Sequence, residues 1–484
     1  MKNPFKYFFS KEAQEGYVPN RDLFAYAVGL AGQNMTYSFQ TSWWYYFCTT
    51  ILRIDPVKVG YVQGASRVWD AVNDPLVGAL IDRRRCKSGE KLRPYLIKTP
   101  PFIAILSVIL FCNFHLSENA ALGIIVVVYL AWDMIYSVQD VALWGMIALS
   151  SPHSHERSRV SQWVTIGAGA GSALVSAFLL LDSQSFRDAA GLSESAVILI
   201  GALIFGFGGE MISMSAYKTK ELVHIDEKPK ENIWQAITVL RHNKTLLLIS
   251  LARFFGMMLS GIDWKYFFKS SVSFNIGGLT LDGETSELVY STVCGIPGAV
   301  ALLFAMPVID KIGGMKKLLI TSECINIVLR IISYFVGFTS APRIIIVTVL
   351  MAAAQVLLNM KDIAHRSLTS DSIDYIEWKT GQRTEGISFS VQNLISKLSD
   401  AGKSIVKGYI MRYIGYDSSL DLKNQGEKFN KAQWPLFILS PVVGAVLYVI
   451  IIAFINDDKE QKAFIEKELR SRRGTPEEEK AEVL

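Results

Sequence analysis

Long apolar stretches alternate with short polar segments along almost the whole chain. Each stretch is about 20 residues or longer, which is the length that an α-helix needs to cross the ~30 Å hydrocarbon core of a membrane. Twelve such stretches occur, at about 22–51, 56–81, 95–115, 120–148, 158–181, 193–216, 245–271, 286–309, 316–338, 343–367, 386–415 and 433–456. The pattern predicts an all-α membrane protein with twelve transmembrane helices.

The composition supports an integral membrane protein and argues against several other classes. Of the 484 residues, 50% are hydrophobic and only 19% are charged, a balance that soluble domains of this length rarely show. The net charge of +5 comes from basic loops, and no basic stripe with interleaved aromatic residues indicates nucleic-acid binding. The five cysteines lack the spacing of a zinc site. No pair of a nucleophile and a base indicates an enzyme.

Basic residues mark the loops that we expect on the cytoplasmic side. Lys and Arg are concentrated in segments 83–93 and 218–241, and positively charged loops of membrane proteins stay in the cytoplasm. Segments 115–120 and 275–286, which fall on the opposite side, are nearly free of them. With twelve spans, both termini are then cytoplasmic. We expect the protein in a bacterial cytoplasmic membrane.

A long charged segment divides the chain into two halves of six predicted spans each. A weak repeat supports the division, because an apolar run, an Asp and a basic cluster follow span two at Asp82 and span eight at Asp310. The tail is dense in Lys, Arg and Glu, and we expect it to be solvated, cytoplasmic and partly helical. The predicted parts are a first bundle at 1–216, a cytoplasmic linker at 217–244, a second bundle at 245–456 and the tail at 457–484.

Two carboxylates lie within the second apolar span. Asn73 and Asp74 follow Asp70 at three and four residues, so all three side chains project from one face of a helix. An ionisable group inside a bilayer costs ~3 kcal/mol even on lenient scales, so the two carboxylates require a compensating partner. Carboxylate and amide oxygens bind hard cations, which predicts a Na⁺ site. An alternative interpretation is an ion pair with Arg67, which is also a candidate substrate contact.

A second polar stripe runs along the fourth span. Asp133, Ser137, Asp140 and Trp144 follow one another at steps of four, three and four residues on an otherwise apolar helix. Carboxylates accept hydrogen bonds from sugar hydroxyls, and an indole face stacks on the apolar face of a pyranose ring. Both acids and the indole are therefore candidate substrate contacts, and Ser137 is a candidate cation ligand. The alternative interpretation is a polar clamp between helices.

Charged residues inside two predicted spans of the second half are further candidates for the site. Lys361 and Asp362 lie in span ten, and Lys397 lies in span eleven. A buried Lys can neutralise one of the carboxylates when no cation is bound, so Lys397 and Asp362 are further candidates for the substrate cavity. An alternative interpretation is that Asp362 only pairs with Lys361 or Lys397.

Two small residues in the fifth span predict a close approach between helices. Gly167 and Gly171 are four residues apart inside an apolar stretch, as in helix pairs that pack closely in membranes. No predicted strand precedes them, which argues against a glycine-rich nucleotide-binding turn.

Several motifs resemble those of the glycoside-pentoside-hexuronide:cation symporters, a family of the major facilitator superfamily. The most specific is Trp69-Asp-Ala-Val-Asn-Asp-Pro75, which precedes a basic segment ending in Arg93-Pro94-Tyr95. Further matches are Tyr136-Ser137, Asp140, Trp144, the segment from Asp371 to Glu385, Ser390-Val391-Gln392 and Lys397. The resemblance covers both halves. It implies the major facilitator fold, in which two pseudo-symmetric halves of six helices hold the substrate near the membrane midplane.

The resemblance also implies roles for single residues. It implies four cation ligands, with Na⁺ favoured because the Asn is present: Asp70, Asn73, Asp74 and Ser137. It places Asn34, Asp140 and Trp144 at sugar-contacting positions, and it matches Lys397 to a lysine near the cation site. The melibiose carrier of this family has an Asp at the position of Asn34, which sets the sugar site of this chain apart. Five charged residues are implied to form a cytoplasmic gate: Asp371, Asp374, Glu377, Arg383 and Glu385.

These observations predict a secondary active symporter. Its expected activity is to couple inward flow of a monovalent cation, Na⁺ with H⁺ or Li⁺ as alternatives, to uptake of a sugar, glycoside or uronide. No cofactor other than the coupling ion is expected. We expect a monomer among membrane lipids. Two alternatives stay open, a lipid or amphiphile carrier of the same fold and a membrane sensor that does not transport.

Overall fold

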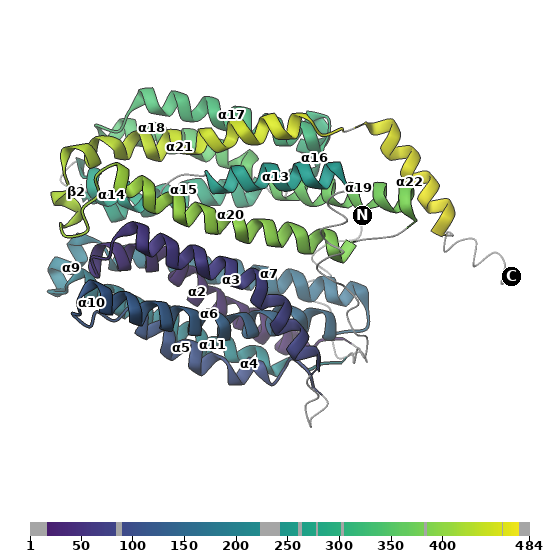
Figure 1. Cartoon of the computed structure of the whole chain (residues 1–484), viewed down its shortest axis with the longest axis horizontal. Helices are drawn as coiled ribbons and strands as arrows, with labels where there is room; N and C mark the ends of the chain where they lie inside the picture. Colours follow the sequence, from purple (N-terminus) through teal and green to yellow (C-terminus); the bar gives the residue numbers. More distant parts are fainter. Residues whose placement is uncertain are drawn as a thin grey trace.

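The computed structural model describes residues 17–83, 90–222, 243–259, 264–276, 279–301, 304–381, 385–456 and 458–473. They form two groups of helices, one built from the first part of the chain and one from the second (Figure 1). Helix α22 (Lys459–Arg473) lies at one end of the molecule, and α9 (Gln184–Ala190) and β2 (Leu279–Leu281) lie at the other. We call these the α22 end and the hairpin end.

The first group consists of described elements between residues 17 and 222. Proline opens two of its helices, a position where the missing N–H has no intrahelical partner in any case. The elements are α2 (Asn20–Tyr46), the π-helical turn η1 (Phe47–Ile51), α3 (Pro56–Arg83), α4 (Tyr95–Lys98), α5 (Pro100–Ile109), α6 (Glu118–Leu149), α7 (Ser154–Ser176), α8 (Phe178–Leu181), α9, α10 (Glu194–Gly201), η2 (Ala202–Gly208), α11 (Gly209–Ser213) and η3 (Met214–Lys218).

The second group consists of described elements between residues 243 and 456, followed by α22. Its elements are α13 (Lys244–Met258), α14 (Trp264–Ser271), β1 (Phe274–Ile276), β2, α15 (Gly283–Ala301), α16 (Ala305–Ile312), α17 (Met315–Val336), α18 (Ala341–Asn359), α19 (Lys361–Thr380), α20 (Glu385–Tyr413), η5 (Leu422–Asn424) and α21 (Glu427–Ala453). Helix α19 continues well beyond residue 367, where the tenth span was predicted to end.

Six helical stretches of the described residues are long and apolar enough to cross a membrane. They are Glu118–Leu149, Glu156–Leu181, Glu194–Lys218, Met315–Val336, Ala341–Lys379 and Glu427–Ala453. A shorter apolar helical stretch covers Tyr95–Ile109, where a longer span had been predicted. These stretches confirm an integral membrane protein.

A short β-hairpin departs from the predicted all-α fold. Strands β1 and β2 pair antiparallel, with Phe274 opposite Leu281 and Ile276 opposite Leu279. The hairpin falls in the segment between spans seven and eight that we predicted to be a plain loop. It is formed by three residues on each side, too short a pattern to stand out in the sequence.

The predicted close approach at Gly167 and Gly171 is confirmed. Both glycines of α7 face the backbone of α2, where a Cβ atom would overlap the carbonyl oxygens of Ala27 and Ala31 respectively. Gly169, between them, has open space at the position of its Cβ. The two helices therefore pack backbone against backbone along one edge of α7.

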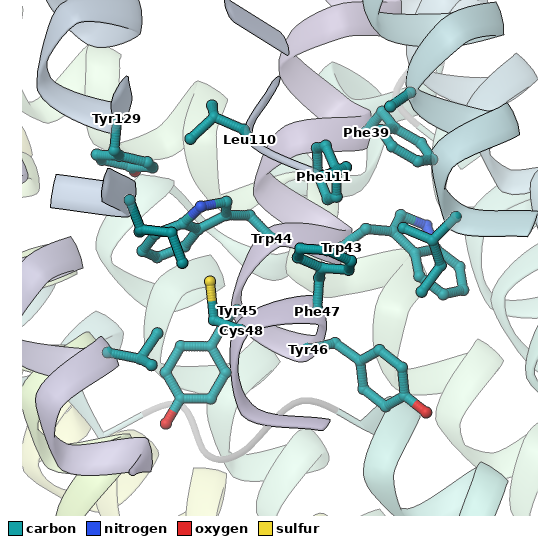
Figure 2. Packing of buried hydrophobic residues seen from close by; sticks show 14 of the residues in the cluster. Phe39, Trp43, Trp44, Tyr45, Tyr46, Phe47, Cys48, Leu110, Phe111 and Tyr129 are labelled. Atoms are coloured by element: carbon teal, nitrogen blue, oxygen red, sulfur yellow. The ribbon is translucent and has the colours of Figure 1, made fainter. Parts of the chain in front are cut away.

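Aromatic side chains fill the core of the first group near the hairpin end. Trp43 and Trp44 project from α2 in opposite directions (Figure 2). Trp44 packs on Tyr129 of α6 with ring centroids 4.4 Å apart, and Phe39 packs on Phe111 at 5.0 Å. Such pairs add stabilisation beyond the apolar area that they bury, so this part of α2 is held rigidly.

Helices α3 and α20 form the main contact between the two groups. A Cβ at Gly60 would lie 2.6 Å from the carbonyl oxygen of Ser404, and one at Gly408 would lie 2.6 Å from that of Pro56. The hydroxyl oxygens of Tyr61 and Tyr409 are 2.8 Å apart. The two helices, which are neighbours in Figure 1, are thus closely packed over their halves nearest the hairpin end.

The tail is partly helical, as predicted, but its helix is not simply solvated. Helix α22 packs on α19, with Ile465 and Leu469 buried. The Nζ atom of Lys462 lies 2.6 Å from Oδ2 of Asp371, and the indole N–H of Trp378 donates to Glu468. The apolar positions of the tail were visible in the sequence, but the surface that covers them was not.

Candidate cation and sugar site

Asp70 forms a buried ion pair in the first group. Its Oδ2 atom lies 3.2 Å from Nη1 of Arg67, one turn earlier on α3. The side chains of Asp70 and Arg67 are only 7% and 15% exposed. The other oxygen of Asp70, Oδ1, accepts no hydrogen bond from the part of the chain that the structure describes. The ion pair that we considered as an alternative is therefore present, but it satisfies only one of the two oxygens.

A second carboxylate faces Asp70 from α6. Asp133 is buried and accepts a hydrogen bond of 2.8 Å from Oγ of Ser66. Its carboxyl is close enough to that of Asp70 for the two to interact electrostatically, and Arg67 interacts with both. Two carboxylates therefore share one guanidinium in a buried site. When both carboxyls are ionised, the excess negative charge favours binding of a further cation.

The other predicted cation ligands lie on the same two helices. Asn73 is buried on α3, and its Nδ2 atom has no hydrogen-bond partner within the described ranges. Ser137 is buried one turn after Asp133 on α6. Asp74 belongs to α3, but its side chain lies outside the described part of the structure.

Lys397 reaches this site from the second group. Its Nζ atom donates a hydrogen bond of 3.3 Å to the backbone carbonyl oxygen of Asp70. The ion pair of the Asp70 carboxylate is formed with Arg67. Arg67 is one helical turn away on the same face, which makes it the nearer cation. That Lys397 neutralises one of the two carboxylates stays a prediction, because the side chain of Asp74 lies outside the described residues. Lys397 connects α20 to α3 at the level of Asp70.

The polar stripe of α6 holds a second cluster. Gln33 of α2 donates from Nε2 to Oδ1 of Asp140 at 2.9 Å, and the same nitrogen hydrogen-bonds to the hydroxyl of Tyr136. Trp144 also donates to Oδ1 of Asp140, at 3.1 Å. Two donors thus fix the orientation of this carboxylate. Trp144 is 40% exposed, so part of its surface is available to a ligand.

Two further predicted sugar contacts, Asn34 and Asp362, lie on different helices. Asn34 donates from Nδ2 to the side-chain oxygen of Gln33 at 2.9 Å and so belongs to the cluster around Asp140. Asp362 lies on α19, but its side chain is outside the described part of the structure. Its neighbour Lys361 forms an ion pair with Glu323 of α17 and lies 4.1 Å from the ring centroid of Tyr448. Among the described side chains, Lys361 therefore pairs with Glu323, and a pairing of Asp362 with Lys361 or Lys397 stays a prediction.

The residues of the predicted cytoplasmic gate lie near the α22 end. Asp371, Asp374 and Glu377 belong to α19, and Asp371 pairs with Lys462 of the tail. Arg383 lies outside the described residues, and Glu385 opens α20 without a described side chain. The structure places the part of this segment up to Thr380 on α19, and it adds the tail as a neighbour.

A family comparison decides what kind of protein carries these clusters. The family model described as "MFS/sugar transport protein" matches residues 25–459, which is most of the chain. The chain is a member of this transporter family. The transporter is therefore not an enzyme. The predicted resemblance to a family of sugar transporters is confirmed.

Relatives that align over most of this chain are also transporters by name. The symporter YjmB of Bacillus subtilis, itself uncharacterised, is 23% identical over 438 residues, which cover 90% of this transporter and 92% of YjmB. An isoprimeverose transporter of Lactiplantibacillus pentosus is 23% identical and covers 91% and 90% of the two chains. A lactose permease of Lactobacillus helveticus is 24% identical, with coverage of 94% and 73%.

A solved structure confirms the major facilitator type of fold. The crystal structure of a bacterial homologue of the human lysosomal transporter Spinster aligns with a TM-score of 0.61 at 14% identity. The alignment covers 94% of this transporter and 98% of that chain.

Sequence analysis missed several residues of the transporter's two clusters. Ser66 and Gln33 hold the carboxylates of Asp133 and Asp140, yet each is an ordinary polar residue within a span. Tyr136 was noted only as part of a motif. A usable signal was the i, i+4 spacing of Tyr136 and Asp140, which places both on the face that Gln33 contacts.

Proposed function

We propose that this transporter is a cation-coupled symporter of a sugar, glycoside or uronide, with Na⁺ as the favoured coupling ion and H⁺ or Li⁺ as alternatives. The observation that carries the proposal is the buried Asp70 carboxylate. Its Oδ2 atom is paired with Arg67, its Oδ1 atom has no hydrogen-bond donor among the described residues, and the carboxyl of Asp133 interacts with it. Leaving such a group unmatched is costly, and a bound cation removes that cost.

The donor set suits Na⁺. Asp70, Asn73, Asp74 and Ser137 offer carboxylate, amide and hydroxyl oxygens, the ligand types that hard cations prefer. Three of them are described as buried, on two helices that pack together, and the fourth follows Asn73 on α3. The proposed ligands are these four residues, and Asp133 contributes charge from the adjacent turn of α6.

Arg67 offers a means of coupling. In this structure its guanidinium occupies one oxygen of Asp70, so a cation entering the site competes with it for the same carboxylate. We propose that cation binding releases Arg67 toward the substrate, which would make cation and sugar strengthen each other's binding. Thermodynamic linkage requires that this effect be reciprocal.

The cluster around Asp140 is the proposed sugar site. Its carboxylate is oriented by Gln33 and Trp144, and the half-exposed indole offers a stacking face. The remaining proposed substrate contacts are Asn34, Arg67, Asp133, Asp362 and Lys397.

The proposed topology has twelve spans, with both termini in the cytoplasm of a bacterium. The bundles at 1–216 and 245–456 rock about the site, and the linker at 217–244 joins them on the cytoplasmic side. The α22 end is then cytoplasmic and the hairpin end is extracellular. The proposed cytoplasmic gate includes Asp371, Asp374, Glu377, Arg383 and Glu385, and the transporter works as a monomer.

A ligand screen tests the proposed function. Glycosides, pentosides and uronides are added to purified protein with Na⁺ or with choline, and the shift in melting temperature is recorded. We expect at least one sugar to stabilise the protein more strongly in Na⁺ than in choline. If amphiphiles stabilise it and no sugar does, the protein is a lipid carrier of the same fold instead.

Asp140→Ala should weaken sugar binding without affecting the cation. The substitution removes a charged acceptor that Gln33 and Trp144 hold in place. Because hydrogen bonds to charged groups contribute about 1.5–3 kcal/mol, we expect sugar affinity to fall roughly 10- to 100-fold. The measurement is a titration by tryptophan fluorescence or calorimetry with the sugar found in the screen.

Two further observations control this prediction. The stabilisation of the Asp140→Ala variant by Na⁺ alone should remain, since the Asp70 site is unchanged. Trp144→Phe keeps a stacking ring and should lose much less affinity than Trp144→Ala. Unchanged sugar affinity in Asp140→Ala would remove this cluster from the sugar site.

A further inference from the structure

A cluster of charged residues joins the two helix groups at the hairpin end. The Nζ atom of Lys269, on α14 of the second group, forms ion pairs with Asp182 and Glu194 of the first group. A second ion pair crosses in the opposite sense. Arg187 lies on α9 of the first group, and its Nη2 atom is 3.4 Å from Oε1 of Glu284 on α15 of the second group. Each group therefore places a cation against a carboxylate of the other. We call these five residues the hairpin-end cluster.

The hairpin-end cluster is removed from solvent. The side chains of Lys269 and Glu284 are 4% and 7% exposed, and that of Asp182 is fully buried. Burial raises the pKa of the Asp182 carboxyl to about 6, although Lys269 acts in the opposite direction. The charges thus lose hydration that their pairing only partly replaces. A buried ion pair of this kind contributes little net stability but is very sensitive to the loss of one partner.

Further contacts extend the cluster into a continuous seam between the groups. Lys265, one turn before Lys269, lies 3.1 Å from the ring centroid of Trp43 and donates to the carbonyl oxygen of Ser42. The hydroxyl oxygens of Thr49 and Tyr266 are 2.6 Å apart. All these contacts link α2 or η1 of the first group with α14 of the second. The two groups are therefore closed against each other at the hairpin end.

We propose that the hairpin-end cluster is the extracellular gate of the transporter, closed in this structure, and that sugar reaches its site from outside only after Lys269 leaves Asp182 and Glu194. This inference rests on the transport by alternating access proposed above. Charged residues suit such a gate because water hydrates them when the halves separate and the ion pairs break. Apolar residues in the same place would favour the closed state throughout the cycle.

The balance of charges also explains why the gate can reopen. On separation the first group keeps Arg187 beside Asp182 and Glu194, and the second keeps Lys269 beside Glu284. Neither surface is left with an isolated charge. The open and closed states can then lie within a few kcal/mol of each other, as a transport cycle requires.

The gate is tested by the accessibility of a buried reporter. Thr49→Cys introduces a thiol at a fully buried position of the seam. Cells expressing this variant are treated from outside with a membrane-impermeant maleimide, and the parent without the reporter corrects for native cysteines. We expect Lys269→Ala to raise the labelling rate about tenfold, because Arg187 is then the one cation of the cluster for three carboxylates, which are better hydrated in the open state.

Two controls accompany the test. Lys431→Ala removes an exposed lysine of α21 that pairs only with Glu427 of the same helix among described residues, and it should leave labelling unchanged. Lys269→Arg keeps the positive charge and should stay close to the parental rate. A folded Lys269→Ala variant with an unchanged labelling rate would overturn the proposal.

A second variant covers the case in which Lys269→Ala does not fold. Arg187→Gln removes the other cation of the hairpin-end cluster, which pairs with Glu284 across the two groups, and the same rise in labelling is expected. An unchanged rate in this variant then counts against the gate. The assay needs neither sugar nor Na⁺. A failure of the gate is therefore distinct from a failure of symport, which is read in the ligand screen.

Discussion

Asp70→Asn is expected to abolish cation-driven sugar uptake while the protein still folds. The substitution keeps the shape of the side chain but removes the charge that the cation and Arg67 share. Arg67 retains Asp133 as a nearby counter-charge, so no isolated buried cation is created. We expect uphill uptake to fall about 100-fold or more, which corresponds to about 2.7 kcal/mol. The measurement is sugar accumulation in proteoliposomes under an inward Na⁺ gradient.

An exposed aspartate provides the matched control for this result. Asp188→Asn makes the same chemical change on the short helix α9, where the side chain faces solvent, and uptake should stay near that of the wild type. Melting temperatures of both variants should be recorded in choline, where no cation contributes. Full Na⁺-driven accumulation by Asp70→Asn would mean that the coupling ion binds elsewhere.

Gly171→Ala is expected to destabilise the first group strongly although it adds only one methyl group. The added Cβ would overlap the carbonyl oxygen of Ala31, and backbone cannot move aside as a flexible side chain can. Helices α2 and α7 would have to separate along their whole contact. Overpacking typically costs about 1–3 kcal/mol, so we expect the melting temperature to fall by roughly 5 °C or more, with a lower yield of folded protein.

Gly169→Ala is the control for this prediction because it lies on the same helix, two residues earlier. Its Cβ would meet open space, so the melting temperature should change by no more than about 1 °C. Equal effects of the two substitutions would show that the loss comes from the helix backbone rather than from the contact with α2.

Local patterns predicted the features that depend on one helix. Hydropathy predicted the long apolar helices, and the spacing of Asp70 and Asn73 placed both on one buried face of α3. The close approach at Gly167 and Gly171 followed from their spacing, although α2 as the partner did not. These features are visible because residues three and four positions apart share a helix face.

Contacts between distant segments were the part that the sequence did not reveal. Gln33 lies 107 positions from Asp140, and Lys269 lies 75 positions from Glu194. Single charges near the ends of spans are common anchors in membrane proteins, so nothing marked Lys269 as the centre of a cluster. The docking of α22 was missed for the same reason, since its partner surface on α19 is formed only in the folded chain.

The energetics of the proposed symport are adequate for accumulation. Each elementary charge that moves down a potential of 100 mV releases about 2.3 kcal/mol, which supports roughly 50-fold accumulation of a neutral sugar. Coupling requires only that the cation and the sugar bind more tightly together than apart. The competition between Arg67 and a cation for Asp70 offers a physical origin for that difference.

The central claim is tested most directly by measuring sugar affinity in purified protein with and without Na⁺. Coupling free energies between sites are typically 1–3 kcal/mol, so we predict that saturating Na⁺ tightens sugar binding roughly 5- to 150-fold. Na⁺ affinity should rise by the same factor when sugar is saturating, and Asp70→Asn should remove both effects. Sugar affinity that is independent of Na⁺, Li⁺ and pH would contradict the account.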